Sequence, residues 1–149
     1  MSEAGRCLIR SADSLPQDGA AQAGRATPHL RDAGASLVRA GSHWSDSWDA
    51  VTLSLREASE SISSAASAFG GGVGEELEAA ASEMEDAPNI GGCTSIGPAA
   101  AAPNLIEIGL HFMSAADMME TGKGGWRMGV SMSMREAAME FVELAEESS

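Results

Sequence analysis

A cluster of methionines between Met113 and Met139 contains the side chains most suited to chemistry in this sequence. Thioether sulfur is a soft ligand that suits Cu(I), and Met128, Met132 and Met134 lie close together in the chain. Methionine is also a flexible filler of protein cores and of adaptable interfaces. Because Met134 falls on a helical line of apolar residues, we interpret the cluster as packing. A Cu(I)-binding protein or a small helical enzyme that uses these methionines and the histidines is the alternative.

Other candidate sites lack part of the pattern that their chemistry requires. His29 and His43 each precede an aspartate by three residues, but two ligands do not make a metal site. The glycine-rich segment 70–74 is followed by two glutamates, which would repel phosphate. Ser131 lacks the second glycine and the preceding strand of a nucleophile elbow. We therefore expect no catalytic residue, no cofactor and no metal.

The charge of the chain is strongly acidic and unevenly distributed. The 149 residues have a formal net charge of -13, which argues against nucleic acid as a partner. Residues 1–39 contain more arginines than acids, and the rest of the chain contains most of the acids. The N-terminal part is therefore predicted to be a weakly basic arm that docks on an acidic surface.

The compartment is only partly constrained by the sequence. Cys7 and Cys93 are the only cysteines, and their pairing is left open. No apolar segment follows the N-terminus as in a secretory signal, and charged residues interrupt the most apolar stretch. We expect an intracellular protein without a transmembrane span. An organelle and a virion are alternative locations. Peripheral association with a membrane stays open.

Apolar residues from Leu30 to Phe69 recur at alternating steps of four and three, which predicts one long helix over 28–69. This helix would be about 63 Å long. Gly34 and Gly41 weaken it and could kink it. Small residues flank the apolar line, which favours close packing in a bundle or against a partner over a two-stranded zipper. The N-terminal arm, 1–26, has little apolar content and is predicted to be extended.

Two further segments complete the predicted organisation. Residues 70–103 form a hinge rich in glycine and proline, with a short acidic helix over 75–86. Residues 104–149 form a helical hairpin, whose first helix is apolar on most sides and is therefore expected to be buried. The predicted fold is all-α and elongated, with the long helix over 27–69 as its main element.

Large apolar residues are sparse, so we expect a thin core that partner proteins complete. The predicted function is a non-catalytic accessory or structural subunit that packs by apolar helix faces into a large multi-protein assembly. A peripheral subunit of a membrane-bound energy-converting complex and a component of a virion-like particle are both consistent with this. The predicted partner interface consists of Leu37, Trp44, Trp48, Val51, Leu55, Ile62, Phe69, Leu105 and Phe112.

Overall fold

Every regular element in the described part of the chain is a helix, as predicted. The computed structural model describes residues 1–16, 22–86, 98–122 and 125–148. The elements are α1 (Ser2–Ser14), the 3-10 helix η1 (Gln22–Ala26), α2 (Thr27–Ser42), α3 (Trp48–Phe69), α4 (Gly71–Asp86), α5 (Pro98–Glu120) and α6 (Trp126–Ser148).

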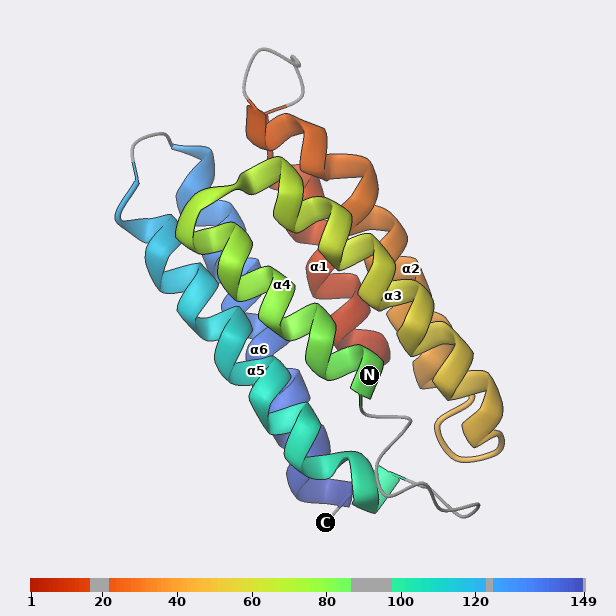
Figure 1. The fold of residues 1–149 in the computed structure, drawn as a ribbon. Helices are drawn as coiled ribbons and strands as arrows, with labels where there is room; N and C mark the ends of the chain where they lie inside the picture. Colours follow the sequence, from red (N-terminus) through yellow and green to blue (C-terminus); the bar gives the residue numbers. More distant parts are fainter. Residues whose placement is uncertain (17–21, 87–97, 123–124, 149) are drawn as a thin grey trace.

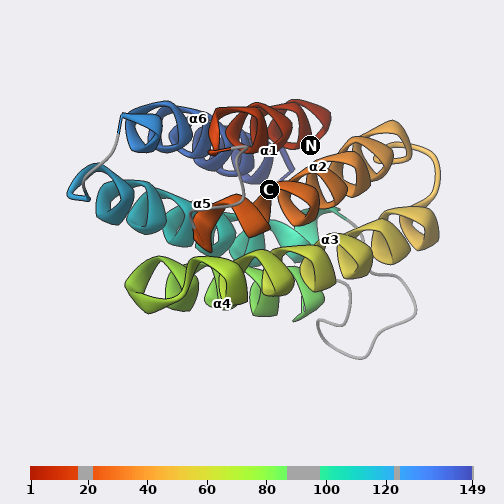
Figure 2. The ribbon, with the colours of Figure 1, turned by 90° about the horizontal axis from the view of Figure 1, so that it is seen from above.

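The six α-helices form a bundle in which each helix packs on its neighbours along the chain (Figure 1). The last helix, α6, also packs on the first, α1, and this contact closes the order of helices into a ring. Seen from above, α1 and α6 lie on one side, α3 and α4 on the other, and α2 and α5 between them (Figure 2). The predicted elongated shape is therefore wrong, because the helices fold back on one another.

The long helix predicted over 28–69 is two helices that pack side by side (Figure 1). The break lies between Ser42 and Trp48, after the glycines at which a kink was predicted. Ser47 begins α3 as its N-cap, and its hydroxyl accepts a hydrogen bond from the backbone N–H of Ala50 at 3.3 Å. Short polar side chains in this segment offer the backbone such local bonds in place of helical ones. The heptad line continues across the break, but its two halves belong to different helices.

Residues 2–14 form α1, so the predicted extended arm is wrong. The buried residues of α1 are mostly small, and Leu8 is the large apolar residue among them. The helix packs on both α2 and α6. At the contact with α2 the backbones approach closely: a Cβ atom added to Gly34 of α2 would lie 2.6 Å from the carbonyl oxygen of Gly5. A Cβ added to Gly41 would lie 2.5 Å from the backbone nitrogen of Ser2. These glycines allow α1 to dock, and α1 buries apolar surface of α2 in return.

Four arginines among residues 1–39 pair with acids of the same chain. Arg10 of α1 bonds Glu136 of α6 at 2.9 Å, and Arg31 of α2 bonds Asp13 of α1 at 2.7 Å. Arg39 of α2 bonds Glu57 of α3 at 2.9 Å. Such exposed pairs contribute little free energy individually, but they fix which acidic surface these helices meet. That surface belongs to the chain itself.

The helices α4 and α5 begin earlier than predicted. The acidic helix predicted over 75–86 extends back to Gly71, because Gly70 and Gly71 adopt the positive φ angles that turn the chain from α3 into α4. The helix α5 starts at Pro98 and contains Pro103. Asn104, the first residue of the predicted hairpin, lies inside α5 and donates a hydrogen bond from Nδ2 to Glu83 of α4 at 2.8 Å.

One connected core runs through the bundle. The stacked rings of Phe112 in α5 and Phe141 in α6, with centroids 5.7 Å apart, are its bulkiest contact. Alanine and serine occupy much of the remaining helix contact, which lets the helices approach closely. The chain therefore covers the apolar line of α2 and α3 with its own helices, contrary to the expected need for partner cover.

Candidate interaction surface

The residues predicted to contact a partner lie mostly in the core of the chain itself. Trp44, Trp48 and Phe69 are half-buried and pack against that core. The other six are fully buried: Leu37, Val51, Leu55, Ile62, Leu105 and Phe112. In the folded chain these six side chains are not exposed to a partner, because neighbouring helices already cover them.

The two tryptophans pack at the break between α2 and α3. Their rings meet edge to face, with centroids 5.3 Å apart and planes at 72°. Such pairs stabilise beyond the area that they bury. The Nε1 atom of Trp48 is buried and has no hydrogen-bond partner among the residues that the structure describes. The two rings thus pack together where the chain turns from α2 into α3.

The methionines proposed as Cu(I) ligands do not converge. Met128 and Met132 are one turn apart and exposed, whereas Met134 points into the core and is fully buried. Within the described ranges, no group of three or more His, Cys, Asp or Glu side chains is placed to hold a metal ion. The geometry thus brings two thioethers together and directs the third away from them.

Replacing Met128 and Met132 together by leucine is expected to change the free energy of unfolding by less than about 1.5 kcal/mol, because the side-chain volume is nearly preserved. Copper content after purification should equal that of wild type. Thermal melting and elemental analysis measure the two quantities. Loss of bound copper in the double variant would show that these sulfur atoms are ligands.

Cys7 is buried on α1 and faces α6. Its sulfur lies 3.0 Å from Arg10 and 3.9 Å from Glu136. Burial raises the pKa of the thiol from 9.0 to about 11, although the Arg10 charge opposes the shift. A thiol with a raised pKa is protonated at neutral pH and is a poor nucleophile. Cys7 is therefore a structural residue in the contact between α1 and α6.

In a Cys93→Ser background, Cys7 is expected to react with iodoacetamide at least about 100-fold more slowly in the folded than in the unfolded chain, since its thiolate is scarcer. The raised pKa also means that stability falls as pH rises from 9.0 to about 11, because only the unfolded thiol ionises there. Mass spectrometry of the alkylated protein measures the rate. Equal rates in both states would show that α1 detaches readily.

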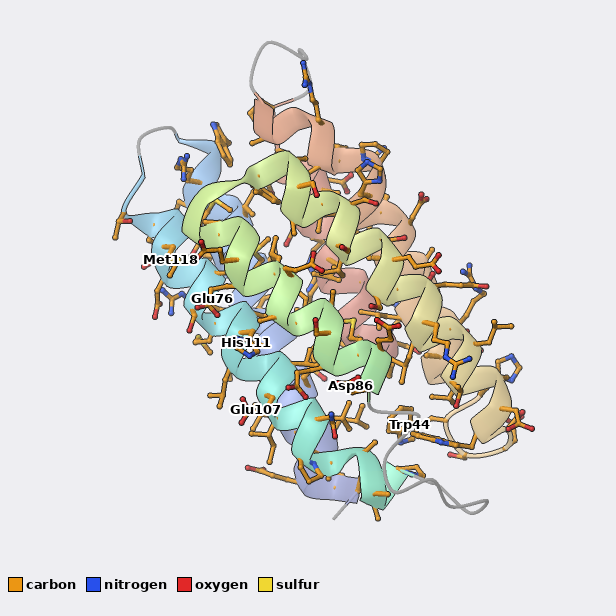
Figure 3. All side chains as sticks on the ribbon, in the orientation of Figure 1. Trp44, Glu76, Asp86, Glu107, His111 and Met118 are labelled. Carbon is orange, nitrogen blue, oxygen red and sulfur yellow. The ribbon has the colours of Figure 1, made fainter. Side chains whose placement is uncertain are left out.

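Two polar contacts connect α5 to its neighbours. His111 of α5 lies 2.8 Å from a carboxylate oxygen of Glu76 in α4, and both side chains are half-buried (Figure 3). The buried hydroxyl of Ser131 in α6 lies 3.0 Å from the carbonyl oxygen of Ala116 and 3.0 Å from the carboxylate of Glu120. These groups hold α4, α5 and α6 together.

A surface pocket of about 300 Å³ lies at the end of the bundle where α3 meets α4 and α5 meets α6. Its lining is largely apolar, with Phe69, Val73, Met119 and Trp126. Arg127 is the charged residue in the lining, and its guanidinium stacks on the ring of Trp126 at 4.8 Å. The arginine therefore contributes to the packing of this end of the bundle.

The most exposed large apolar side chains outside α3 gather on the helical hairpin of α5 and α6. Met128, Met132 and Met139 are each more than half exposed, and their separations of four and seven residues place them on one line of α6. Ile106 and Leu110 are exposed on α5 in the same way, one turn apart.

The register of the hairpin brings these two sets together on one outer face. A Cβ added to Gly109 of α5 would lie within 3 Å of Val142 and Ala138 of α6, and Arg135 lies 3.5 Å from the sulfur of Met113. Half-buried Met113 and Val142 therefore lie between the two exposed sets. We call this set the hairpin face: Ile106, Leu110, Met113, Met128, Met132, Met139 and Val142. From Val142 to Met128 it is about 21 Å long.

Acidic side chains surround the hairpin face. Arg135 lies within it, but its charge is met by Asp117 and by Glu120 at 2.8 Å. Glu143 lies along one edge on α6, and Glu107 projects from the outer side of α5 (Figure 3). Burial is the main cause that raises the pKa of Glu140; the carboxylate of Glu143 adds to the shift, and the N-terminal ammonium group opposes it.

The hairpin face was not predicted, although the sequence contains a pattern for it. The apolar line through Val130, Met134 and Phe141 predicts the buried side of α6 correctly. The second line, through Met128, Met132 and Met139, has helical spacing on the opposite side and was interpreted as packing. Likewise, α5 was expected to be buried because it is apolar on most sides, but Leu110 is 52% exposed.

Comparison with protein-family models, with curated proteins and with solved structures finds no significant match. Among the helices that the structure describes, none combines the length and apolar character needed to cross a membrane. The assignment of function therefore depends on the surface and its chemistry.

Proposed function

We propose that this chain is a non-catalytic accessory subunit that docks into a larger protein assembly through the hairpin face. The observation that carries the proposal is the run of exposed methionine, leucine and isoleucine side chains along α5 and α6. Exposed apolar side chains gathered in this way are costly in water and usually mark a contact with another molecule. Methionine suits such a surface, since its flexible side chain adapts to a partner.

The internal contacts support a structural role over a catalytic one. The candidate nucleophiles Cys7 and Ser131 are buried, and both are engaged with neighbouring helices. His111 is engaged with Glu76. Each of these side chains connects two helices of the bundle, so the hairpin face is carried on a scaffold whose polar groups are used for its own assembly.

Site-specific photo-cross-linking in extracts of the native source tests the proposal. A photo-reactive phenylalanine analogue at Leu110 or at Met139 should yield the same discrete protein adduct. The matched control places it at Leu53 on α3, which is 61% exposed and lies outside the hairpin face. Met132→Asp should abolish the adducts formed from the first two positions. Adducts that are absent, or equally strong from Leu53, would refute docking through this face.

A further inference from the structure

We infer that the occupant of the hairpin face is a basic amphipathic helix of a partner protein. The inference rests on the proposed function, because it names the chemistry of the partner that docks there. It follows from the dimensions of the hairpin face and from the charge around it.

The shape of the hairpin face fits one helix. Its length of about 21 Å corresponds to about 14 residues of an α-helix. It is narrow, being formed by one line of side chains on each of two antiparallel helices. A helix that docks on such a surface presents apolar residues at positions i, i+3 or i+4, and i+7. Exposed methionines accept several apolar side chains at these positions, because thioether chains rearrange at little cost.

The charge argues against the two other common occupants of an apolar face. A second copy of this chain would bring another molecule of net charge -13, with its own acidic edge, against the first. An anionic membrane surface would likewise be repelled by Glu107, Glu143 and their acidic neighbours. A helix with lysine or arginine beside its apolar stripe would instead be attracted by Glu107 and Glu143.

The acidic residues beside the hairpin face differ in whether they already pair with an arginine of the same chain. Glu136 already bonds Arg10, and Asp117 and Glu120 bond Arg135. Among the described residues, Glu107 and Glu143 form no ion pair with a basic side chain of the chain. The cationic side chains of the partner are therefore expected near Glu107 and Glu143.

A panel of helical peptides of about 15 residues tests the inference directly. Each peptide carries one apolar stripe, and its polar face consists of lysine and arginine, or of glutamate. A scrambled basic peptide has the same composition without the stripe. Fluorescence anisotropy measures binding to the full chain at about 50 mM and about 500 mM NaCl. Basic striped peptides should bind at least about tenfold more tightly than acidic or scrambled ones, and more weakly at high salt.

Protein variants assign the binding to the hairpin face. Leu110→Asp should weaken the basic peptides at least about tenfold, whereas Leu53→Asp should leave them unchanged. Glu107→Gln with Glu143→Gln should weaken the basic peptides several-fold and strengthen the acidic ones. Circular dichroism of each variant shows that the bundle is intact.

Several outcomes would overturn the inference. Equal binding of scrambled peptides, tighter binding of acidic peptides, no binding at all, or binding that Leu110→Asp leaves unchanged would each do so. Self-association lost in Leu110→Asp, measured by sedimentation, would assign the face to a second copy, and binding to vesicles with anionic lipid would assign it to a membrane. If adducts from Leu110 form in the native extract but the basic striped peptides do not bind as expected, the chain docks through the hairpin face and only the basic character of the partner is wrong. If those adducts are absent, docking itself fails.

Discussion

Leu55→Asp is expected to lower the free energy of unfolding by about 4 kcal/mol or more, which is a large part of the stability of a domain of this size. Leu55 is fully buried in α3, within the connected core. The substitution removes apolar contacts and places an unpaired carboxylate where water is excluded. Chemical denaturation followed by circular dichroism measures the loss.

Leu53→Asp on the same helix is the matched control. Leu53 is two residues away and 61% exposed, so its replacement should change the free energy of unfolding by less than about 0.5 kcal/mol. The contrast separates burial within the chain from burial by a partner. If Leu55→Asp leaves the isolated chain stable but removes it from its assembly, the line on α3 is a partner surface after all.

Gly34→Leu is expected to have the second-largest effect, with a loss of about 3 kcal/mol or more. A Cβ at this position would meet the carbonyl oxygen of Gly5 and the Cγ1 atom of Ile9, each at 2.6 Å. One of these atoms is backbone, so the clash is relieved only if α1 moves away from α2. Displacement of α1 would expose Cys7, and its alkylation should accelerate together with the fall in melting temperature.

Gly125→Leu serves as the control for this substitution. A Cβ at Gly125 would meet nothing within 4 Å, so the same change of residue should alter stability by less than about 0.5 kcal/mol there. An unchanged melting curve and slow alkylation of Cys7 in Gly34→Leu would show that the two helix backbones are not in close contact. In that case the N-terminal segment would not be part of the bundle.

If the partner is a basic helix, the arginines and the acids of the bundle serve different contacts. Arg10, Arg31 and Arg39 are used inside the chain to join α1, α2 and α3 to acidic neighbours. The acidic residues beside the hairpin face would pair with the cationic side chains of the partner. Binding should therefore be fast and sensitive to salt, as expected when opposite charges steer association.

The sequence by itself determined the helical class, because the spacing of apolar residues is a local property. The alternation of fours and threes marks the buried sides of α2, α3 and α6 correctly. The break before α3 was also within reach, since Ser47 followed by Asp49 is a common helix start. The helix over 2–14 was missed because its buried side consists mostly of small residues, which look the same in a loop.

Only the tertiary structure decided which molecule covers each apolar face. Periodicity shows that Leu37 and Leu55 share a line, but not that the chain folds back and covers them itself. Gly34 looks like a weak point in a helix until α1 is placed against it at 2.6 Å. The methionines of α6 have helical spacing on both sides, and the position of α5 decides that Met134 is core while Met132 stays exposed. Burial depends on contacts between residues far apart in the chain, and such contacts leave no local pattern.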